Sequence, residues 1–137
     1  MTATALPALG EAACPPSGPV PVGGGKQPFD RHTALYSYVI VRTDLSAQQQ
    51  TVQAIHAAMA ATAHHGGLTD DTRLALLAAR DQRQLYDIAD ALEREGIAFS
   101  LFEEPDHGIG ASALATAPGP FARFRCLKRL PLWGAVA

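Results

Sequence analysis

The sequence predicts a three-layer α/β domain, in which helices cover both faces of a sheet. Two observations lead to this prediction. From residue 35 onward, strand-like and helix-like segments follow one another in the order strand, helix, strand, helix, strand, strand, as in βαβ units. The first strand-like segment is also apolar on both faces, which is typical of an interior strand of a covered sheet. We therefore expect a sheet that is at least partly parallel.

Length and composition fit one such domain. The chain has 137 residues, of which 47% are hydrophobic and 18% charged, enough apolar side chain to build a core. Its net charge of −2 argues against binding nucleic acid through bulk positive charge. No apolar run could span a bilayer, and the N-terminus lacks the pattern of a signal peptide. We expect no membrane partner and a cytoplasmic location.

The first 30 residues differ in composition from the remainder of the chain. They contain six prolines and a run of three glycines, which cannot keep a helical or strand period. We predict a flexible arm over residues 1–30, with a docking peptide for a partner as the alternative. The single α/β domain then covers residues 31–137 and includes a basic C-terminal tail over 121–137.

The first strand and helix of the domain follow directly after the arm. The β-branched and aromatic run Leu35–Val41 predicts the strand. Asp44 or Ser46 could cap the helix, which we expect over about residues 47–64, before His64-His65-Gly66-Gly67 ends it. The spacing of Val52, Ile55 and Met59 predicts its buried stripe. A second stripe beside it holds Gln49, Gln53, His56 and Ala60.

The second half of the domain repeats the pattern with shorter elements. Residues 74–79 predict a buried strand, although periodicity alone would equally allow a helix. A helix follows, because Asp81 and Gln84 resemble a capping box and Gly96 suits its end. Residues 97–102 and 113–116 predict the last two strands, the latter closed by Pro118-Gly119-Pro120. The short link between these strands leaves no room for a crossover helix, so the last strand should run antiparallel or at an edge.

Polar side chains collect where the first and third strands end. Arg42, Thr43 and Asp44 leave the first strand, and Glu103, Glu104 and Asp106 leave the third. If these strands are parallel, their carboxyl ends share one edge of the sheet, where ligands bind. The helix start above that edge adds Gln49, Gln50, Gln53 and His56. Such a cluster can orient a water, take its proton and stabilise an oxyanion, unless these groups are only helix caps and solvated loop charges.

Other polar groups give weaker evidence for a functional site. His64 and His65 with Asp70 and Asp71 have the residue types of metal ligands, but adjacent histidines at a helix end are seldom ligands. Cys14 and Cys126 lie too far apart to suggest a disulfide framework, and two thiols cannot complete a zinc site. We predict no metal and no cofactor. The tail interleaves four basic residues with apolar ones; this pattern favours an amphipathic segment packed on the domain over a nucleic-acid contact.

Several stretches of the domain carry recognisable motifs: Val41–Leu45, Gln50, Gln53–Ala58, Phe102–Asp106 and Ser112–Pro118. Together they resemble type II peptidyl-tRNA hydrolases, and within these a bacterial branch of hydrolase-like proteins. In that family a strand ending in an Arg/Asp-Leu segment leads into a helix bearing Gln-x-x-His-Ala. An acidic loop then precedes a Thr-rich final strand. The resemblance covers roughly residues 35–133.

The resemblance implies a cytosolic α/β fold with a mixed four-stranded sheet flanked by helices. It also implies hydrolysis of the ester between a peptide, or an aminoacyl group, and the 3′ end of tRNA, which makes tRNA or peptidyl-tRNA the expected partner. Carried over by position, Gln53 and His56 match the helix motif. Glu104 falls where the family has its functional aspartate, with Asp106 as a rival, and Ser112 stands at a position usually held by threonine.

These positions suggest roles for each residue. Glu104 or Asp106 would activate water as general base, and His56 would orient that water or carry its proton. Gln53 and Gln50 would donate hydrogen bonds to the substrate carbonyl. Arg42 would pair with a phosphate or hold Asp44 in place. We therefore predict His56, Glu104, Asp106 and Gln53 as catalytic, and Arg42, Asp44, Gln50 and Ser112 as substrate-binding.

One departure from the family supports a second hypothesis. Typical members have a Gly/Lys-rich turn before the helix, whereas Ser46–Gln50 contains no lysine; the chain's lysines are Lys26 and Lys128. The alternative function is a non-catalytic module on the same fold that binds a nucleotide, RNA or a protein. Members of the family often pair, so a homodimer is possible.

Overall fold

The computed structural model describes residues 30, 33–67, 69 and 71–135. The arm predicted over residues 1–30 therefore lies outside the described residues, apart from Asp30. The strands are β1 (Leu35–Arg42), β2 (Arg73–Ala79), β3 (Phe99–Glu104), β4 (Gly110–Thr116) and β5 (Gly119–Pro120). The helices are α1 (Ala47–His65) and α2 (Gln82–Arg94), with 3₁₀ segments η1 (Asp106–Gly108) and η2 (Phe121–Leu127). Every predicted helix and strand is present, with its bounds shifted by a few residues.

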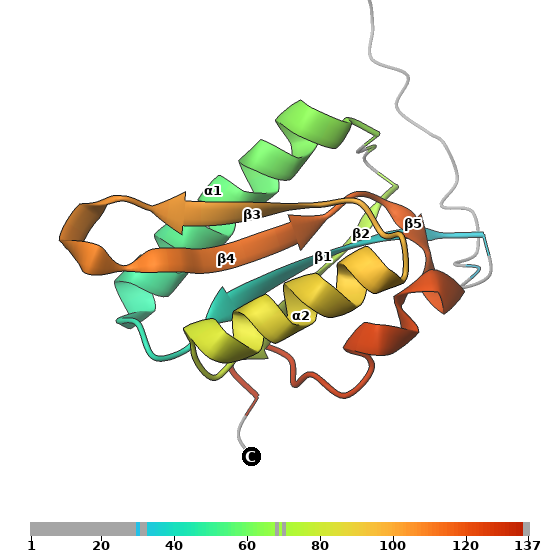
Figure 1. Cartoon of the computed structure of the whole chain (residues 1–137). Coiled ribbons are helices and arrows are strands. Elements are labelled where there is room, and N and C mark those ends of the chain that lie inside the picture. The colour runs from blue at the N-terminus through green and yellow to red at the C-terminus, as the bar shows by residue number, and fades with distance from the viewer. Residues whose placement is uncertain (1–29, 31–32, 68, 70, 136–137) are drawn as a thin grey trace, which may run out of the picture.

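The strands form one mixed sheet in the order β2-β1-β4-β3 (Figure 1). Strand β1 pairs with β2 in parallel, and β4 is antiparallel to both β1 and β3. The first and third strands are therefore parallel to each other, although β4 lies between them. The last long strand is antiparallel, as predicted, and lies inside the sheet.

The expected four strands are one too few. The segment predicted only as a closing turn forms β5, which pairs antiparallel with the start of β1. This short strand makes the sheet five-stranded.

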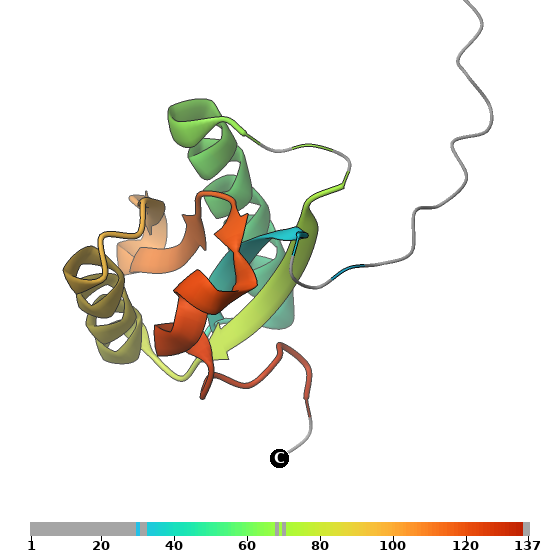
Figure 2. The same ribbon diagram turned by 90° about the vertical axis from the view of Figure 1, so that its right-hand side faces the viewer.

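Helices cover both faces of the sheet, which confirms the three-layer α/β prediction (Figures 1 and 2). Alternating residues of β1 divide between two cores. Val39 and Val41 pack with α1, whereas Tyr38 and Ile40 pack with α2 and η2. None of the described helices is both long and apolar enough to cross a membrane.

Local hydrogen bonds explain where the helices begin and end. Ser46 caps α1: its Oγ accepts from the Gln49 N–H at 3.2 Å, and Gln49 Oε1 accepts from the Ser46 N–H at 3.1 Å. This reciprocal pair satisfies free donors of the first turn. Asp81 caps α2 by accepting from the Gln84 N–H at 2.8 Å. Gly66 and Gly96 follow the two helices with φ of 61° and 67°, a conformation that favours glycine.

The predicted buried stripe of α1 is wrong. Val52, Ile55 and Met59 are 43%, 55% and 64% exposed. The buried side chains are Gln53, Ala54, Ala57 and Ala61, which lie on nearly the opposite side of a helix that turns about 100° per residue. Helix α1 packs on Ala113 and Ala115 of β4; small residues on both sides allow a close approach that large side chains would prevent.

The C-terminal tail packs on the α2 face of the domain, as predicted. Phe124 and Leu127 of η2 are buried in the core on that face. The following chain then runs along the outer edge of β2. Pro131 O accepts from the Ala78 N–H at 2.9 Å, and the Trp133 N–H donates to Leu76 O at 2.8 Å. These bonds satisfy backbone groups that an edge strand would otherwise leave open.

Candidate functional site

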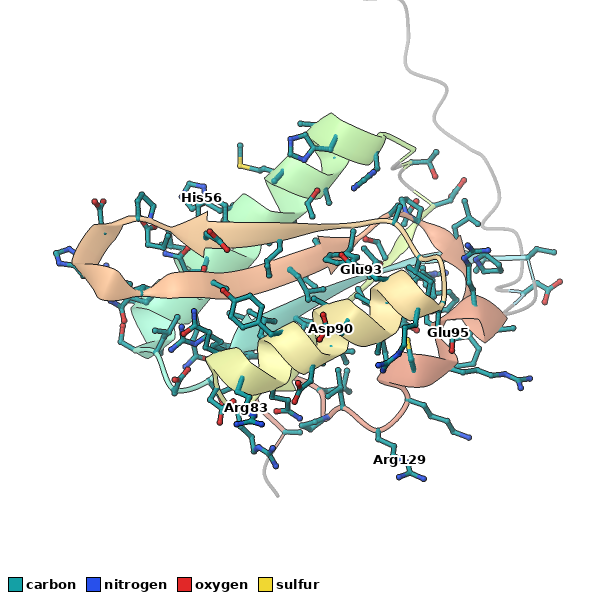
Figure 3. All side chains as sticks on the ribbon, viewed as in Figure 1. His56, Arg83, Asp90, Glu93, Glu95 and Arg129 are labelled. Carbon is teal, nitrogen blue, oxygen red and sulfur yellow. The ribbon has the colours of Figure 1, made fainter. Side chains whose placement is uncertain are left out.

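Three elements meet at one end of the sheet. Because β1 and β3 are parallel, both end at this edge, and the first turns of α1 begin there. Figure 3 shows His56 on α1 above the carboxyl end of β3. The side chains of Gln53, Ser112 and Glu104 come from α1, β4 and β3 and are joined by hydrogen bonds. We call this arrangement the Gln53 bridge.

Gln53 is the centre of the bridge and is only 3% exposed. Its Nε2 donates to Glu104 Oε2 at 3.0 Å, and its Oε1 accepts from Ser112 Oγ at 3.1 Å. A carboxylate only accepts hydrogen bonds, so the amide nitrogen must face Glu104 and the amide oxygen must face Ser112. Residues 51 and 59 positions away from Gln53 thereby hold one buried amide in a single orientation.

A β-bulge places Ser112 in the bridge. The pairing of β3 with β4 shifts between Phe102 and Glu103, which face Ala113 and Ala111 and leave Ser112 as the extra residue. Ala111 packs in the α2-side core and Ala113 in the α1-side core. The Ser112 hydroxyl faces Gln53 on the α1 side, so two successive residues of β4 point to the same face. The bulge breaks the alternation of the strand, and this re-aims a hydroxyl into the site.

Glu104 is held as a carboxylate at this edge. Its Oε1 also accepts from the backbone N–H of Asp106 at 3.2 Å. The hydrogen bond from Gln53, then that from Asp106, lower the pKa of Glu104 below its ordinary value; burial opposes this, and His56 and His107 add to it. Each of these donors favours the charged form. A carboxylate with a lowered pKa holds and orients a donor well but is a weak proton acceptor.

His56 lies beside this carboxylate. Its ring stacks on Phe102 with centroids 4.6 Å apart and planes inclined by 4°. The side chain is exposed, and among the described residues it makes no hydrogen bond, which leaves both ring nitrogens for water or a ligand. The imidazole and the acidic loop are thus on the same side of the molecule. Asp106 contributes its backbone N–H to Glu104, and its own side chain is exposed.

Arg42 and Asp44 form a separate pair at the end of β1. The guanidinium is bidentate on the carboxylate, with Nε–Oδ1 and Nη2–Oδ2 distances of 2.9 and 2.8 Å. Its Nη1 donates to Ile109 O and Ala111 O at 2.7 and 3.0 Å. The guanidinium holds the pKa of Asp44 below its usual value. Of the two suggested roles of Arg42, holding Asp44 is confirmed, and pairing with a phosphate stays a prediction.

The side-chain amide of Gln50 is hydrogen-bonded to other groups of the protein. Its Nε2 donates to Thr43 O at 3.2 Å and to Leu45 O at 2.6 Å, which closes the loop between β1 and α1. Its Oε1 accepts from Trp133 Nε1 at 2.7 Å. A role as donor to a substrate carbonyl would require one of the two loop bonds to break. Trp133 thus lies against Gln50, and the ring of His56 stays exposed.

The histidine pair at the end of α1 is not part of this site. His64 Nδ1 and His65 Nε2 lie 3.0 and 3.3 Å from Ser100 Oγ on β3. Of the two aspartates suggested with them, Asp70 is outside the described residues, and Asp71 is exposed. Within the ranges that the structure describes, no group of three or more His, Cys, Asp or Glu side chains could hold a metal ion.

Two contributors to the site were missed by sequence reasoning. Phe102 carries the ring of His56, and its position two residues before Glu104 was a usable signal, since such residues share a strand face. The bulge at Ser112 left no signal, because Ala-Ser-Ala reads as ordinary alternation.

Comparison with known proteins gives no functional assignment, so a functional conclusion depends on the geometry of the site. No protein-family model matches the chain, and no curated protein matches it significantly.

Proposed function

We propose that the chain is a hydrolase resembling type II peptidyl-tRNA hydrolase, which cleaves the ester between a peptide or aminoacyl group and the 3′ end of tRNA. The observation that supports this most directly is the Gln53 bridge with His56 beside it. Residues that match the family motif in three distant stretches meet around one carboxylate and one exposed imidazole.

In the proposed reaction, water attacks the acyl carbon and the ribose oxygen leaves. Glu104, ionised and fixed by Gln53 and Asp106, orients the water by accepting a hydrogen bond from it. Because its pKa is lowered, it is poorly suited to take the proton itself. His56 takes the other proton of the water and delivers it to the departing ribose oxygen, a two-way transfer for which imidazole is well suited. Gln53 and Ser112 act by holding Glu104 and do not touch the substrate.

The test is single-turnover hydrolysis of a labelled peptidyl-tRNA by the wild type, His56→Ala, Glu104→Gln and Asp106→Asn. We expect His56→Ala and Glu104→Gln to lower the rate by about 100-fold or more, as for other general acid–base groups. Asp106→Asn should change it by less than about threefold, because the backbone N–H that binds Glu104 remains.

Glu103→Gln is the matched control, since Glu103 is an exposed neighbour on the same strand outside the bridge. Circular dichroism should show that all variants keep the fold. Equal rates in the wild type and the His56 and Glu104 variants would refute the proposal.

A second candidate function is favoured by one further observation. The turn that precedes α1 has no lysine, and Arg42 is bonded to Asp44 and to two carbonyls. Few cations are therefore free at this edge to hold a phosphate. This weakens the case for tRNA as a substrate and supports the alternative of a non-catalytic module, which, of a nucleotide, RNA or a protein, would bind a protein most readily.

A titration with deacylated tRNA at several salt concentrations separates these functions. Binding that weakens steeply with salt, with no turnover by the wild type, indicates the module, because phosphate contacts release counterions. Turnover that depends on His56 indicates the hydrolase.

A further inference from the structure

A cavity lies on the other face of the sheet from the Gln53 bridge. It has a volume of about 540 Å³, is open to solvent on one side, and is lined by β1, β2, η2 and the chain that follows η2. Tyr38 and Leu77 form its base on the sheet, and Phe124 and Leu127 line it from η2. In Figure 2, η2 and the chain after it arch past β2 on this side. Sites for small organic ligands have volumes of roughly 300–1,000 Å³.

The wall of the cavity is anchored at both ends. On one side Phe124 and Leu127 are buried in the core. On the other, Leu132 forms an antiparallel bridge with Leu77, and Trp133 donates to Gln50. Hydrogen bonds of Pro131 and Trp133 hold the end of this segment at the edge of β2, while Phe124 packs on the ring of Tyr38.

The lining is largely apolar but carries two cations, Arg125 and Lys128. Neither forms a salt bridge with any described residue. Residues 121–135 contain four basic side chains and no acidic one, in a chain whose net charge is −2. Tyr38, which also lines the cavity, carries a hydroxyl. Burial raises the pKa of Tyr38, so this phenol remains a hydrogen-bond donor at neutral pH.

We propose that this cavity binds a small amphipathic carboxylate, with its hydrocarbon chain against Leu77, Phe124 and Leu127 and its anionic head at Arg125 and Lys128. An apolar wall and unpaired cations are what such a ligand requires, because the chain leaves water and the head keeps a charged partner. Residues 1–29 are a poorer occupant. Their one acidic side chain, Glu11, is balanced by Lys26, so they offer no matching net charge.

Decanoate is the probe for this site. Binding to the full chain is measured by calorimetry and by the fluorescence of Trp133, the chain's one tryptophan, which follows the lining residue Leu132. We expect saturable binding of decanoate, with decanol and decyltrimethylammonium at least about tenfold weaker. Equal binding of the alcohol or of the cation would overturn the assignment of the head group.

Variants test the place of binding. Arg125→Glu/Lys128→Glu should weaken decanoate about tenfold or more by reversing both charges. Arg129→Glu is the matched control: it reverses an exposed charge of the same run that does not line the cavity, and it should change the affinity by less than about twofold. Ala122→Phe, which adds bulk to an exposed lining residue, should abolish binding. Unchanged affinity in both lining variants would refute this site.

Two further measurements test other occupants. Sedimentation velocity with and without decanoate shows whether the cavity is an interface between copies: a dimer that decanoate dissociates would overturn the proposal, and a mass that decanoate leaves unchanged supports it. Flotation with phosphatidylserine vesicles is the second. Vesicle binding that the charge reversals remove, without any binding of free decanoate, would assign the patch to a membrane surface and refute the carboxylate.

Discussion

The two faces of the sheet are built from side chains of different size. On the α1 face, Ala54 and Ala57 pack against Ala113 and Ala115. On the α2 face, large side chains such as Ile40, Leu85, Leu92 and Leu114 are fully buried. Alanine on both sides lets the helix approach the sheet closely. That approach brings the Gln53 amide within hydrogen-bonding distance of Ser112 and Glu104.

The two faces therefore contribute differently: the α2 face mainly stabilises the fold, and the α1 face mainly positions polar side chains. Fully burying a large aliphatic side chain contributes about 1.5–3 kcal/mol, so the α2 face supplies most of the driving force for folding. The α1 face has the smaller core, but its close contact holds polar groups in fixed positions. The α2 face, which is covered by η2 and the chain after it as well as by α2, also contains the cavity beside η2.

The largest effect should come from truncating the α2 face. Leu85→Ala removes a side chain that is 0% exposed, and we expect the free energy of unfolding in urea to fall by about 2–5 kcal/mol. Leu132→Ala, at a position 60% exposed, is the control and should cost less than about 1 kcal/mol. Similar losses in both would contradict the view that this core dominates stability.

Enlarging a residue on the α1 face should have the next largest effect. Ala57→Leu adds bulk at a position that is 0% exposed against β4, so unfolding free energy should fall by about 1–3 kcal/mol. Ala63→Leu makes the same change at an exposed position of α1 and should be nearly neutral. If Ala57→Leu were neutral too, close packing would not explain the helix position.

Lowering the pH should weaken the Arg42–Asp44 pair at the end of β1. The lowered pKa of Asp44 means that its ionised form stabilises the fold at neutral pH. This contribution is present above the unfolded pKa, near 4, and is lost as pH falls through the lower folded value. Because the Asp44 side chain is 39% exposed, solvent screens the pair, and we expect at most about 1 kcal/mol.

Urea unfolding at pH 7 and pH 3 checks this sign. The wild type should lose more stability on acidification than Asp44→Asn, so the difference between the two proteins should be smaller at pH 3 than at pH 7. An identical pH dependence in both would show that the Arg42–Asp44 pair contributes nothing.

The smallest effect is expected on the outer side of α1. Ile55→Lys changes a side chain that is 55% exposed, so the unfolding free energy should stay within about 0.5 kcal/mol of wild type. A loss of several kcal/mol would mean that the stripe of Val52, Ile55 and Met59 is covered, for example by a second copy of the chain. Sedimentation of the wild type would then show a dimer that this variant dissociates.

Local patterns were sufficient for most of the architecture. Asp81, Gly66 and Gly96 marked helix ends, and Ser46 was one of two candidate caps, because capping and a positive φ are properties of a few adjacent residues. Alternation of strands and helices was sufficient for the three layers. The grouping of Gln53, His56 and Glu104 at one edge also followed, because parallel strands place their carboxyl ends together.

The sequence by itself therefore determined the two helices, four of the five strands and the set of polar residues near the strand ends, since each depends on short-range rules. Only the tertiary structure decided which side of α1 is buried, because the partner surface on β4 is made of alanine and serine and favours small residues over the larger stripe of Val52, Ile55 and Met59. It also decided that Ser112 faces Gln53, since a bulge depends on how two strands pair. The tethering of the tail through Trp133 to Gln50 joins residues 83 positions apart, a contact that no local pattern predicts.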